Sequence, residues 1–538
     1  MEQADWMPFF PYAEPRIQQV DIINKALEAY NAGKKFVIIE AGTGVGKSAI
    51  GYTISSYISN NSIPKDGYLA GSYFLTTQKI LQEQYVKDFG RLGLKSIKSS
   101  ANYSCRFYKN NTCAESSRAL KTAEKGSSFW NACTFSCNYK NRKKEFLDSA
   151  SSITNFPYFL AETTYSGKLQ PRQVLVTDEC HNAETQLSKF IEVAVTEKFA
   201  KQFLKLDFPL VKTQLQAFEW IENVYVPKLK SYVKHTEDIL SKHHGLKDKL
   251  QEFVSLAKRF EILDKHVCKM KRFLKLYDKE NWVFNDIQAY GRKSRRFEFK
   301  PIDVAPFAND MLFKLGSFNI LMSATIIDKD HFCELLGIES GEAEFVSAPS
   351  PFPTKNRPIV AVPIGRMRAA DIENTLPRLA EAVNSILENH PKDKGIIHCH
   401  TFKIANYLKK NIRSRRLMIH NSENREDVLR KHMSSKKASV LLSPSMTEGV
   451  DLKEELSRFQ IICKVPYPYL GDKLIKKKMH KWKWWYPFQT AKTIIQSAGR
   501  SVRSIDDKAV TYILDADWDK FYQKNNRLFP TDFQECLK

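Results

Sequence analysis

The sequence predicts an α/β protein in which buried strands alternate with helices, and three stretches carry this prediction. Residues 36–40 form a short apolar run typical of a strand, glycines follow it, and apolar residues with helical spacing begin after Lys47. A second apolar run, 174–176, ends close to two adjacent carboxylates. Between 186 and 300, apolar residues recur three and four apart amid lysine and glutamate, which predicts a mainly helical region.

The composition fits a large folded protein with a strongly basic surface. The 538 residues suffice for roughly three or four domains of ordinary size, and contents of 43% hydrophobic and 12% aromatic residues are ample for buried cores. The formal charge of +23 and the isoelectric point near 9.4 indicate a polyanionic partner. Nucleic acid is the first candidate and an anionic membrane surface the second. A generally basic surface without such a partner is the alternative.

The sequence also indicates an intracellular protein. Its start, MEQADWMPFFPY, lacks the basic residues and apolar run of a secretory signal. No stretch reaches about 18 consecutive apolar residues, so we expect no membrane span. Ten cysteines in such a chain argue against a disulfide scaffold. We expect a reducing compartment, either the cytoplasm or nucleoid of a bacterial or phage-infected cell or a eukaryotic nucleus, where cysteine clusters more often bind metals or catalyse reactions.

The glycine-rich stretch after residue 40 has the composition and context of a phosphate-binding loop. Backbone N–H groups freed of side-chain bulk can surround phosphate oxygens, and the N-terminus of the following helix favours negative charge. We expect Lys47 to reach the β- and γ-phosphates of ATP and the Ser48 hydroxyl to ligate Mg²⁺. The residues of the loop are Ala41, Gly42, Thr43, Gly44, Val45, Gly46, Lys47 and Ser48.

Two carboxylates stand at the tip of the second apolar strand, in the stretch QVLVTDECHNAE at 173–184. Adjacent charges at the end of a buried strand are costly unless a cation or a reaction requires them. Downstream of a phosphate-binding loop, Asp178 can hold Mg²⁺ through water and Glu179 can polarise the attacking water. We expect His181 to lie at the boundary between the nucleotide and the rest of the protein.

With its A-x-x-G-x-G-K loop and its Asp-Glu-Cys-His box, the chain resembles the DEAD/DEAH-type superfamily 2 helicases. Further stretches resemble that family's motifs in the same order: an R-x-x-Q element, a Thr-Thr-Gln stretch, a Ser-Ala-Thr signature, and a fifth and a sixth motif. The matching residues are Arg16, Gln19, Thr76, Thr77, Gln78, Ser323, Ala324, Thr325, Glu448, Gly449, Asp451, Gln496, Gly499, Arg500 and Arg503.

This resemblance implies a role for each motif. The R-x-x-Q element would read adenine. The sixth motif would complete ATP binding with Gln496 and Gly499, while Arg500 and Arg503 act on the γ-phosphate as arginine fingers. The Ser-Ala-Thr signature and the fifth motif, together with His181, would couple ATP state to domain movement. The Thr-Thr-Gln stretch would contact the DNA backbone.

Four cysteines lie between the loop and the acid pair: Cys105, Cys113, Cys133 and Cys137, separated by 7, 19 and 3 residues. Zinc ribbons pair C-x₂₋₄-C with a second such pair, which the first gap fits poorly. Their number and position resemble the XPD/DinG family of helicases, in which such an insert holds a [4Fe–4S] cluster. The stretches ITNFPYFL, APSPF and KVPYPYL resemble further elements of that family. Zinc, and cysteines packed without metal, are the alternatives.

The XPD/DinG resemblance implies two RecA-like parallel-sheet motor domains, of which the first carries both an iron–sulfur insert and a mainly helical insert similar to the Arch domain. The expected ranges are 1–185 and 301–341 for the first motor domain, 95–150 for the iron–sulfur insert within it, 186–300 for the Arch-like insert, 342–358 for a proline-rich linker and 359–538 for the second motor domain.

A lysine- and aromatic-rich segment, KLIKKKMHKWKWWYPF at 473–488, is a candidate nucleic-acid contact. Lysines can meet phosphates while aromatic rings stack on the bases of a single strand. Lys481, Trp482 and Trp484 are the residues that we expect to do so. The alternative is that these aromatic residues pack against the second motor domain.

Together, these features and the resemblance predict an ATP-dependent DNA helicase that uses ATP, Mg²⁺ and a [4Fe–4S] cluster. It would translocate on single-stranded DNA, 5′ to 3′ as in the family, and separate forked duplexes. We expect a monomer whose partners are replication or repair proteins. The alternatives are an RNA-directed or translocase-only superfamily 2 protein, and a nucleic-acid-stimulated ATPase switch that does not separate strands.

Overall fold

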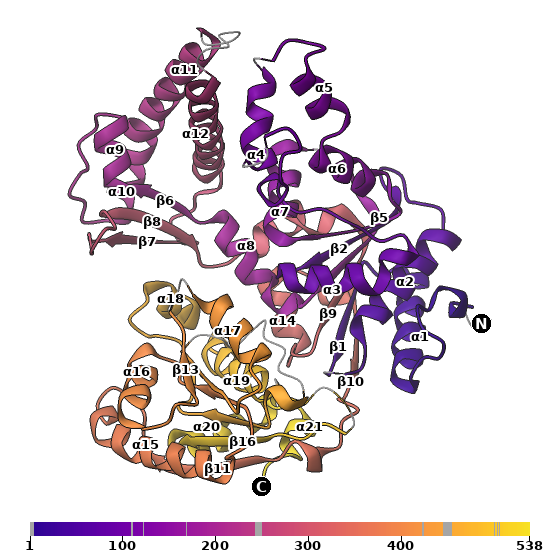
Figure 1. Ribbon diagram of the computed structural model, residues 1–538, viewed down its shortest axis with the longest axis vertical. Helices are drawn as coiled ribbons and strands as arrows, with labels where there is room; N and C mark the ends of the chain where they lie inside the picture. The colour runs from indigo at the N-terminus through magenta and orange to yellow at the C-terminus, as the bar shows by residue number, and fades with distance from the viewer. Residues whose placement is uncertain are drawn as a thin grey trace.

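The computed structural model describes residues 5–42, 44–108, 111–121, 123–167, 169–242, 250–421, 424–444, 454–499, 501–502, 504 and 506–538. Two α/β bodies, each built on a parallel sheet, lie one above the other in Figure 1, and two projections rise from the upper body. We call the upper one the first body and the lower one the second body.

The first body is built on a seven-stranded sheet in the order β10-β1-β9-β5-β2-β4-β3, in which all neighbours are parallel. Residues of β1 alternate between two cores, with Ile38 in one and Val37 and Ile39 in the other, so both faces of the sheet are covered. The strands are β1 (Phe36–Ala41), β2 (Leu69–Thr76), β3 (Lys95–Ser96), β4 (Ser151–Asn155), β5 (Arg172–Asp178), β9 (Gly316–Ser323) and β10 (Ala343–Ala348). The main helices are α1 (Ile17–Asn31), α2 (Lys47–Asn61), α3 (Lys79–Phe89), α7 (Phe156–Ala161), α13 (Ala305–Met311) and α14 (Lys329–Leu336).

The second body is built on a six-stranded parallel sheet in the order β11-β16-β15-β12-β14-β13. Two parallel sheets confirm the predicted fold class. The strands are β11 (Ile359–Gly365), β12 (Gly395–His398), β13 (Leu417–Ile419), β14 (Val440–Ser443), β15 (Phe459–Ile462) and β16 (Val510–Asp515). The helices are α15 (Ile372–Asn389), α16 (Phe402–Asn411), α17 (Arg425–Ser434), α18 (Lys473–Lys481), α19 (Trp485–Ala498), α20 (Asp517–Asn525) and α21 (Thr531–Gln534).

The structure differs from the predicted linker at 342–358. Residues 343–348 form β10, which pairs in parallel with β1 at the edge of the first sheet. This stretch alternates buried and more exposed positions, as an edge strand does. The irregular connection between the bodies therefore begins only at Pro349, where the proline-rich stretch begins.

The region predicted as a mainly helical insert contains helices and a small antiparallel sheet. Helices α11 (Val226–Lys242) and α12 (Leu250–Leu276) form its projecting arm in Figure 1. At its base lies a three-stranded antiparallel sheet in the order β6-β8-β7. The strands are β6 (Val193–Thr196), β7 (Trp282–Ile287) and β8 (Arg296–Pro301), and the shorter helices are α8 (Ala183–Ile191), α9 (Glu197–Phe203) and α10 (Gln214–Trp220).

The second projection is the cysteine-containing insert between β3 and β4. It is made of short helices, α4 (Cys113–Ser116), α5 (Ser128–Phe135) and α6 (Asn138–Asp148). Its Arg118 donates from Nε and Nη2 to Oε2 of Glu261 on α12, at 3.0 and 2.9 Å. The two projections seen side by side in Figure 1 are therefore in direct contact.

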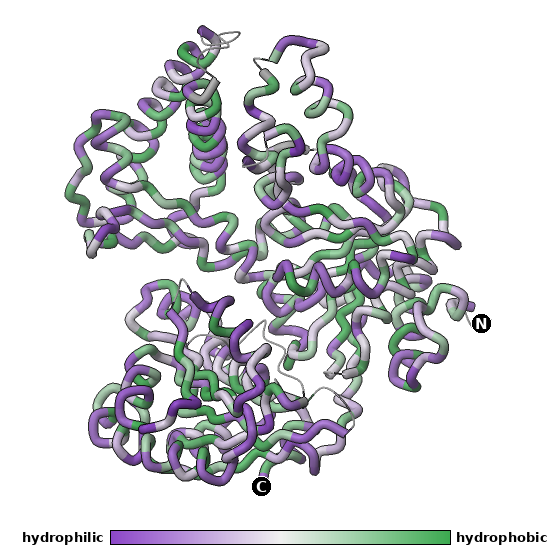
Figure 2. The backbone as a smooth tube through the Cα atoms, viewed as in Figure 1, coloured by the Kyte–Doolittle hydropathy of each residue, from purple (hydrophilic) through white to green (hydrophobic). Residues whose placement is uncertain are grey.

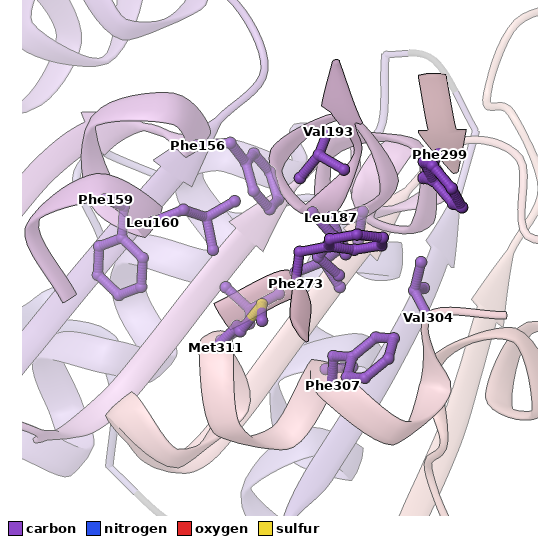
Figure 3. Close-up of a cluster of buried hydrophobic side chains, with 14 of the residues drawn as sticks. Phe156, Phe159, Leu160, Leu187, Val193, Phe273, Phe299, Val304, Phe307 and Met311 are labelled. Atoms are coloured by element: carbon purple, nitrogen blue, oxygen red, sulfur yellow. The ribbon is translucent and has the colours of Figure 1, made fainter. Parts of the chain in front are cut away.

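One hydrophobic core joins the first sheet to the base of the helical insert. Figure 3 shows side chains of this core converging from α7, α8, α12, α13 and β8, with Leu187 of α8 beside Phe273 of α12. Figure 2 shows hydrophobic residues along the strands of both sheets and polar residues over much of the outer helices. In the described part of the chain, no helix has the length and apolar character needed to cross a membrane.

Candidate functional site

The glycine-rich loop connects β1 to α2 at the carboxyl edge of the first sheet. Gly44 and Gly46 both have φ of 89°, a conformation that residues with a side chain rarely adopt. Lys47 begins α2 and donates from Nζ to the carbonyl oxygen of Ala41 at 3.1 Å. Its ammonium group therefore reaches back across the loop. Thr43 lies outside the described residues, and Val45 is buried.

The R-x-x-Q element lies against this loop. A Cβ atom built on Gly46 would come within 2.5 Å of Nε2 of Gln19. The Arg16 guanidinium donates to the carbonyl oxygen of Gly44. The backbone N–H of Arg16 also donates to Oε1 of Gln19 at 2.9 Å, which fixes the start of α1. Two predicted ATP-binding side chains thus contact the phosphate-binding loop directly.

The Ser-Pro-Phe element covers the other side of the loop, a contact that sequence reasoning missed. A Cβ atom built on Gly44 would lie 2.0 Å from Cζ of Phe352, and one built on Gly42 would lie 2.6 Å from the backbone N of Ser350. The Phe352 ring also packs against Val502 of the second body. Phe352 therefore contacts both the loop and the sixth-motif region.

The acid pair begins where β5 ends. Asp178 is buried, and its Oδ2 accepts a hydrogen bond from the Tyr85 hydroxyl at 2.9 Å. Burial, and next the charge of Glu179, raises the pKa of Asp178 to about 6, while Lys47 lowers it. Burial raises the pKa of Tyr85, which also interacts with Ser48. A desolvated carboxylate beside a hydroxyl has the donor chemistry of a Mg²⁺ site, since a cation would offset the cost of its charge.

His181 connects the acid pair to the Ser-Ala-Thr signature. His181 Nδ1 lies 3.3 Å from Oε2 of Glu179 and 2.7 Å from Oγ of Ser323. That Ser323 oxygen accepts from the backbone N–H of Thr325 at 3.0 Å. Predicted catalytic and coupling residues thus meet at His181, which contacts Glu179 on one side and Ser323 on the other.

Glu40 makes a second contact that the sequence did not predict, with the segment that follows the Ser-Ala-Thr signature. Its Oε1 accepts from the backbone N–H groups of Ile326 and Ile327, at 2.6 and 2.7 Å. Burial raises the pKa of Glu40. This carboxylate holds the segment after the Ser-Ala-Thr signature against the strand that leads into the phosphate-binding loop.

The fifth and sixth motifs are described only in part. Gln496 is buried on α19, and Gly499 follows the last residue of that helix. Glu448, Gly449, Asp451, Arg500 and Arg503 lie outside the described residues.

The Thr-Thr-Gln stretch lies at the carboxyl end of β2. The Thr76 side chain is buried and donates from Oγ1 to the carbonyl oxygen of Gln78 at 3.2 Å, so it stabilises the turn. Thr77 and Gln78 are half-buried, and Gln78 is the N-cap of α3. These two residues are therefore better placed than Thr76 to meet a nucleic-acid backbone.

The structure contradicts the predicted nucleic-acid contact of Trp482. This side chain is 4% exposed, and its indole Nε1 donates to Oε1 of Glu334 on α14 at 2.7 Å. Trp484 donates to the same carboxylate at 3.2 Å and stacks on His331, with ring centroids 3.9 Å apart. Lys481 pairs with Asp303 at 2.5 Å. The physical reason is that the Trp482 ring is buried between the bodies and its indole N–H is used by Glu334 of the first body.

The four predicted metal-binding cysteines gather in the second projection. The sulfur atoms of Cys113 and Cys137 are 3.4 Å apart. Burial, followed by Cys137, Cys133 and Cys105, raises the pKa of Cys113 to about 12. Over the described ranges, no group of three or more His, Cys, Asp and Glu side chains is arranged to hold one metal ion. Four thiols close together in one small insert have the donor chemistry of either a zinc site or an iron–sulfur cluster.

Two family models match the chain. The Type III restriction enzyme, res subunit model matches residues 12–208, which include the phosphate-binding loop and the acid pair. The Helicase C-terminal domain model matches residues 385–536, which include the sixth motif.

Curated relatives are named ATP-dependent DNA helicases. The chain is 27% identical over 243 residues to YoaA of Escherichia coli strain K12, over 42% of this chain and 37% of that protein. It is 20% identical over 426 residues to YoaA of Haemophilus influenzae, over 70% and 66%. It is 26% identical over 242 residues to DinG of Photobacterium profundum, over 40% and 34%. The matches thus span between 34% and 66% of the length of these relatives.

Solved structures share the fold. An XPD helicase superposes with a TM-score of 0.64 at 15% identity, over 96% of this chain and 98% of that one. The Xpd4 protein of S. tokodaii gives a TM-score of 0.57 at 15% identity, over 97% and 99%. The arrangement of two parallel-sheet bodies with two inserts in the first is therefore one that known proteins adopt.

Proposed function

We propose that the chain is an ATP-dependent DNA helicase of the XPD/DinG type, which translocates on a single strand and separates duplexes; its similarity to named ATP-dependent DNA helicases and to the XPD fold supports this. The observation that carries the proposal is the unit in which His181 contacts both Glu179 and Ser323, beside the strand that leads into the glycine-rich loop. Such a unit can convert a change at the γ-phosphate into a shift of the chain between β9 and the second body.

We assign the steps of ATP hydrolysis to residues of the first body. Lys47 would neutralise charge on the β- and γ-phosphates, and Glu179 would orient and deprotonate the attacking water. Ser48 and Asp178 would hold Mg²⁺, which when bound polarises the phosphate oxygens. Arg16 and Gln19 would bind the adenine side of the nucleotide, and Arg500 and Arg503 would approach the γ-phosphate from the second body.

The [4Fe–4S] cluster is part of the proposal. Cys105, Cys113, Cys133 and Cys137 would hold it, and the closeness of these four thiols within one small insert supports this assignment. When bound, the cluster would cross-link an insert made of short helices that buries little apolar surface of its own. The insert could then keep a fixed shape while duplex strands are forced apart beside it.

The nucleic acid would be single-stranded and forked DNA. The charge of +23 supports a polyanionic substrate, and Thr77 and Gln78 at the carboxyl edge of the first sheet are the proposed backbone contacts. Polarity of 5′ to 3′ is proposed from the family alone.

A strand-displacement assay on a forked duplex with a 5′ single-stranded arm tests this function. We expect ATP-dependent separation by the wild-type protein, none by Glu179→Gln, and little separation of a fork that carries only a 3′ arm. A matched RNA fork distinguishes an RNA-directed enzyme. DNA-stimulated ATP hydrolysis without separation of any fork would instead support an ATPase switch and overturn the proposal.

A further inference from the structure

Helix α18 and the turn after it connect the second body to the first through three carboxylates. Lys478 contacts Glu184, Lys481 pairs with Asp303, and Trp482 donates to Glu334. Lys473 adds a fourth contact, from Nζ to the backbone carbonyl oxygen of Phe284 on β7 at 3.4 Å. The residues Leu335, Trp482 and Trp485 form a small apolar core within this interface. Helix α18 and the turn after it thus contact α8, α14 and strand β7 of the helical insert.

The Lys478–Glu184 pair differs from the Lys481–Asp303 pair because both of its side chains are largely buried. The Lys478 side chain is 5% exposed and that of Glu184 is 14% exposed. The ammonium group also lies 5.4 Å from the ring centroid of Trp485. Taking two charges out of water is costly, so removing one partner leaves the other charge uncompensated. A buried ion pair adds little net stability to an interface. The position of Glu184 in the chain suggests a second role for the pair.

Glu184 lies next to the acid pair along the chain. It is the second residue of α8, and only the turn Cys180–Asn182 separates this helix from Glu179. His181 is in that turn and bonds to Ser323. On its other side α8 is anchored, because Leu187 is fully buried in the core shown in Figure 3. Because Leu187 holds the following turn of α8 in place, a movement of Glu184 at the start of the helix is passed to the preceding turn, which carries His181.

We propose that Lys478 is a positioning residue for ATP hydrolysis, which holds Glu184 from the second body and thereby sets the place of Glu179 and His181 against the phosphate-binding loop. This inference rests on the proposed function, since it assigns ATP hydrolysis to the first body. Through Lys478 and Glu184, the second body would thus affect the position of the acid pair independently of the arginine fingers.

The test compares steady-state ATP hydrolysis by four variants. Lys478→Met removes the charge and keeps the chain length, and Lys478→Arg keeps the charge. Trp482→Phe weakens the same interface by removing the hydrogen bond to Glu334, and Lys477→Met is a control at an exposed neighbour on α18. The melting temperature of each variant is measured alongside kcat and KM.

We expect Lys478→Met to lower kcat about tenfold or more, with KM for ATP within about twofold, because misplacing a catalytic group by ~1 Å can cost about a hundredfold. Lys478→Arg should recover most of that loss. Trp482→Phe and Lys477→Met should keep kcat within about twofold of wild type, even where Trp482→Phe lowers the melting temperature.

Two results would overturn the inference. One is a kcat for Lys478→Met within twofold of wild type. The other is an equal fall in kcat for Trp482→Phe at an equal loss of melting temperature, which would make the pair a structural contact. If the wild-type protein hydrolyses ATP but separates no duplex, the proposed function fails, and the same comparison of kcat values still decides the role of Lys478.

Discussion

Glu179 holds a backbone conformation that residues with a side chain usually avoid. Its φ is 52°, in the left-handed region, at the junction between β5 and the turn that follows. Such conformations cost on the order of 1–3 kcal/mol and persist where the surroundings over-determine them. Here buried Asp178 fixes one side of the residue and the His181–Ser323 bond fixes the other. The strain is thus located at the residue to which we assign activation of water.

Lys47→Ala and Glu179→Gln should each nearly abolish ATP hydrolysis and leave the fold intact. Both side chains are only half-buried, so neither fills a core. Loss of a charge contact to a transition state typically lowers kcat about a hundredfold or more. A coupled ATPase assay, with circular dichroism as the check on folding, measures this.

A matched control is Lys25→Ala, which removes an exposed lysine that pairs with Asp21 on α1 and should change nothing. Glu179→Gln should still bind nucleotide. Hydrolysis by Lys47→Ala or Glu179→Gln within about twofold of wild type would contradict the assigned roles.

His432 should make the second body sensitive to acid. It is fully buried, its Nε2–H donates to the carbonyl oxygen of Leu456 at 2.8 Å, and its Nδ1 accepts from the Ser439 hydroxyl at 2.9 Å. Burial lowers the pKa of His432 to about 4. Between pH ~6.5 and about 4, the His432 imidazole is protonated in the unfolded chain and neutral in the folded chain. As the pH falls through this range, the free energy of unfolding therefore decreases by about 1.4 kcal/mol per pH unit.

Urea unfolding of wild type and His432→Leu between about pH 4.5 and 7 checks this sign. The variant should start less stable, because two hydrogen bonds are lost, yet its stability should fall less steeply as the pH drops. Equal slopes would show that His432 does not carry the proton linkage.

At the scale of elements, apolar periodicity predicted the long helices of the insert and missed two short strands, β8 and β10. The loop between β1 and α2 was predictable, because Gly44 and Gly46 adopt the positive φ that a tight turn needs there. The strand β8 was hidden within a helical pattern, although Arg296–Pro301 alternates buried and part-buried side chains with a period of two. The strand β10 was hidden by the prolines that follow it. Both strands exist because distant partners, β6, β7 and β1, offer them hydrogen bonds.

Cys133→Ser should lower the iron content of the protein and abolish strand separation, while part of the ATP hydrolysis remains. The insert with Cys133 lies between β3 and β4, and the phosphate-binding loop follows β1, so the two sites have separate scaffolds. Protein purified without oxygen should be brown and carry ~4 iron atoms per chain. Iron analysis, ATPase and strand separation on one preparation measure all three.

Cys268→Ser on α12 is the matched control, since this thiol is exposed and lies outside the group of four. It should keep its iron. A colourless wild-type protein with ~1 zinc per chain would support the zinc alternative, and full strand separation without bound metal would leave these cysteines as packing residues.

At the scale of the whole molecule, no pattern in the sequence indicates which groups the aromatic segment at 473–488 contacts. The hydrogen bond from Trp482 to Glu334 joins residues 148 positions apart, one in the turn after α18 and the other on α14. The composition of this segment suits nucleic acid and a buried interface equally. Only the tertiary arrangement of the two bodies distinguishes them.

Affinity for DNA should fall steeply with salt. Lysine and arginine contacts release counterions from phosphates, so the logarithm of the association constant falls linearly with the logarithm of salt concentration. With a charge of +23, we expect a loss of about tenfold or more between ~50 and ~200 mM salt, and tighter binding to a single strand than to a blunt duplex of equal length. Fluorescence anisotropy measures both. A flat salt response or a preference for blunt duplex would count against a single-strand motor.

Residues 349–358 connect the two bodies, and in the described chain they are the one covalent crossing between the two sheets. Each insert, in contrast, leaves the first sheet and returns to it. Cutting the backbone within 349–358 would leave every strand of both sheets in place. It would also turn the meeting of the halves into a bimolecular reaction, because the tether no longer sets their effective concentration. Hydrolysis by the two pieces would then be second order in protein at high dilution, whereas the uncut chain remains first order.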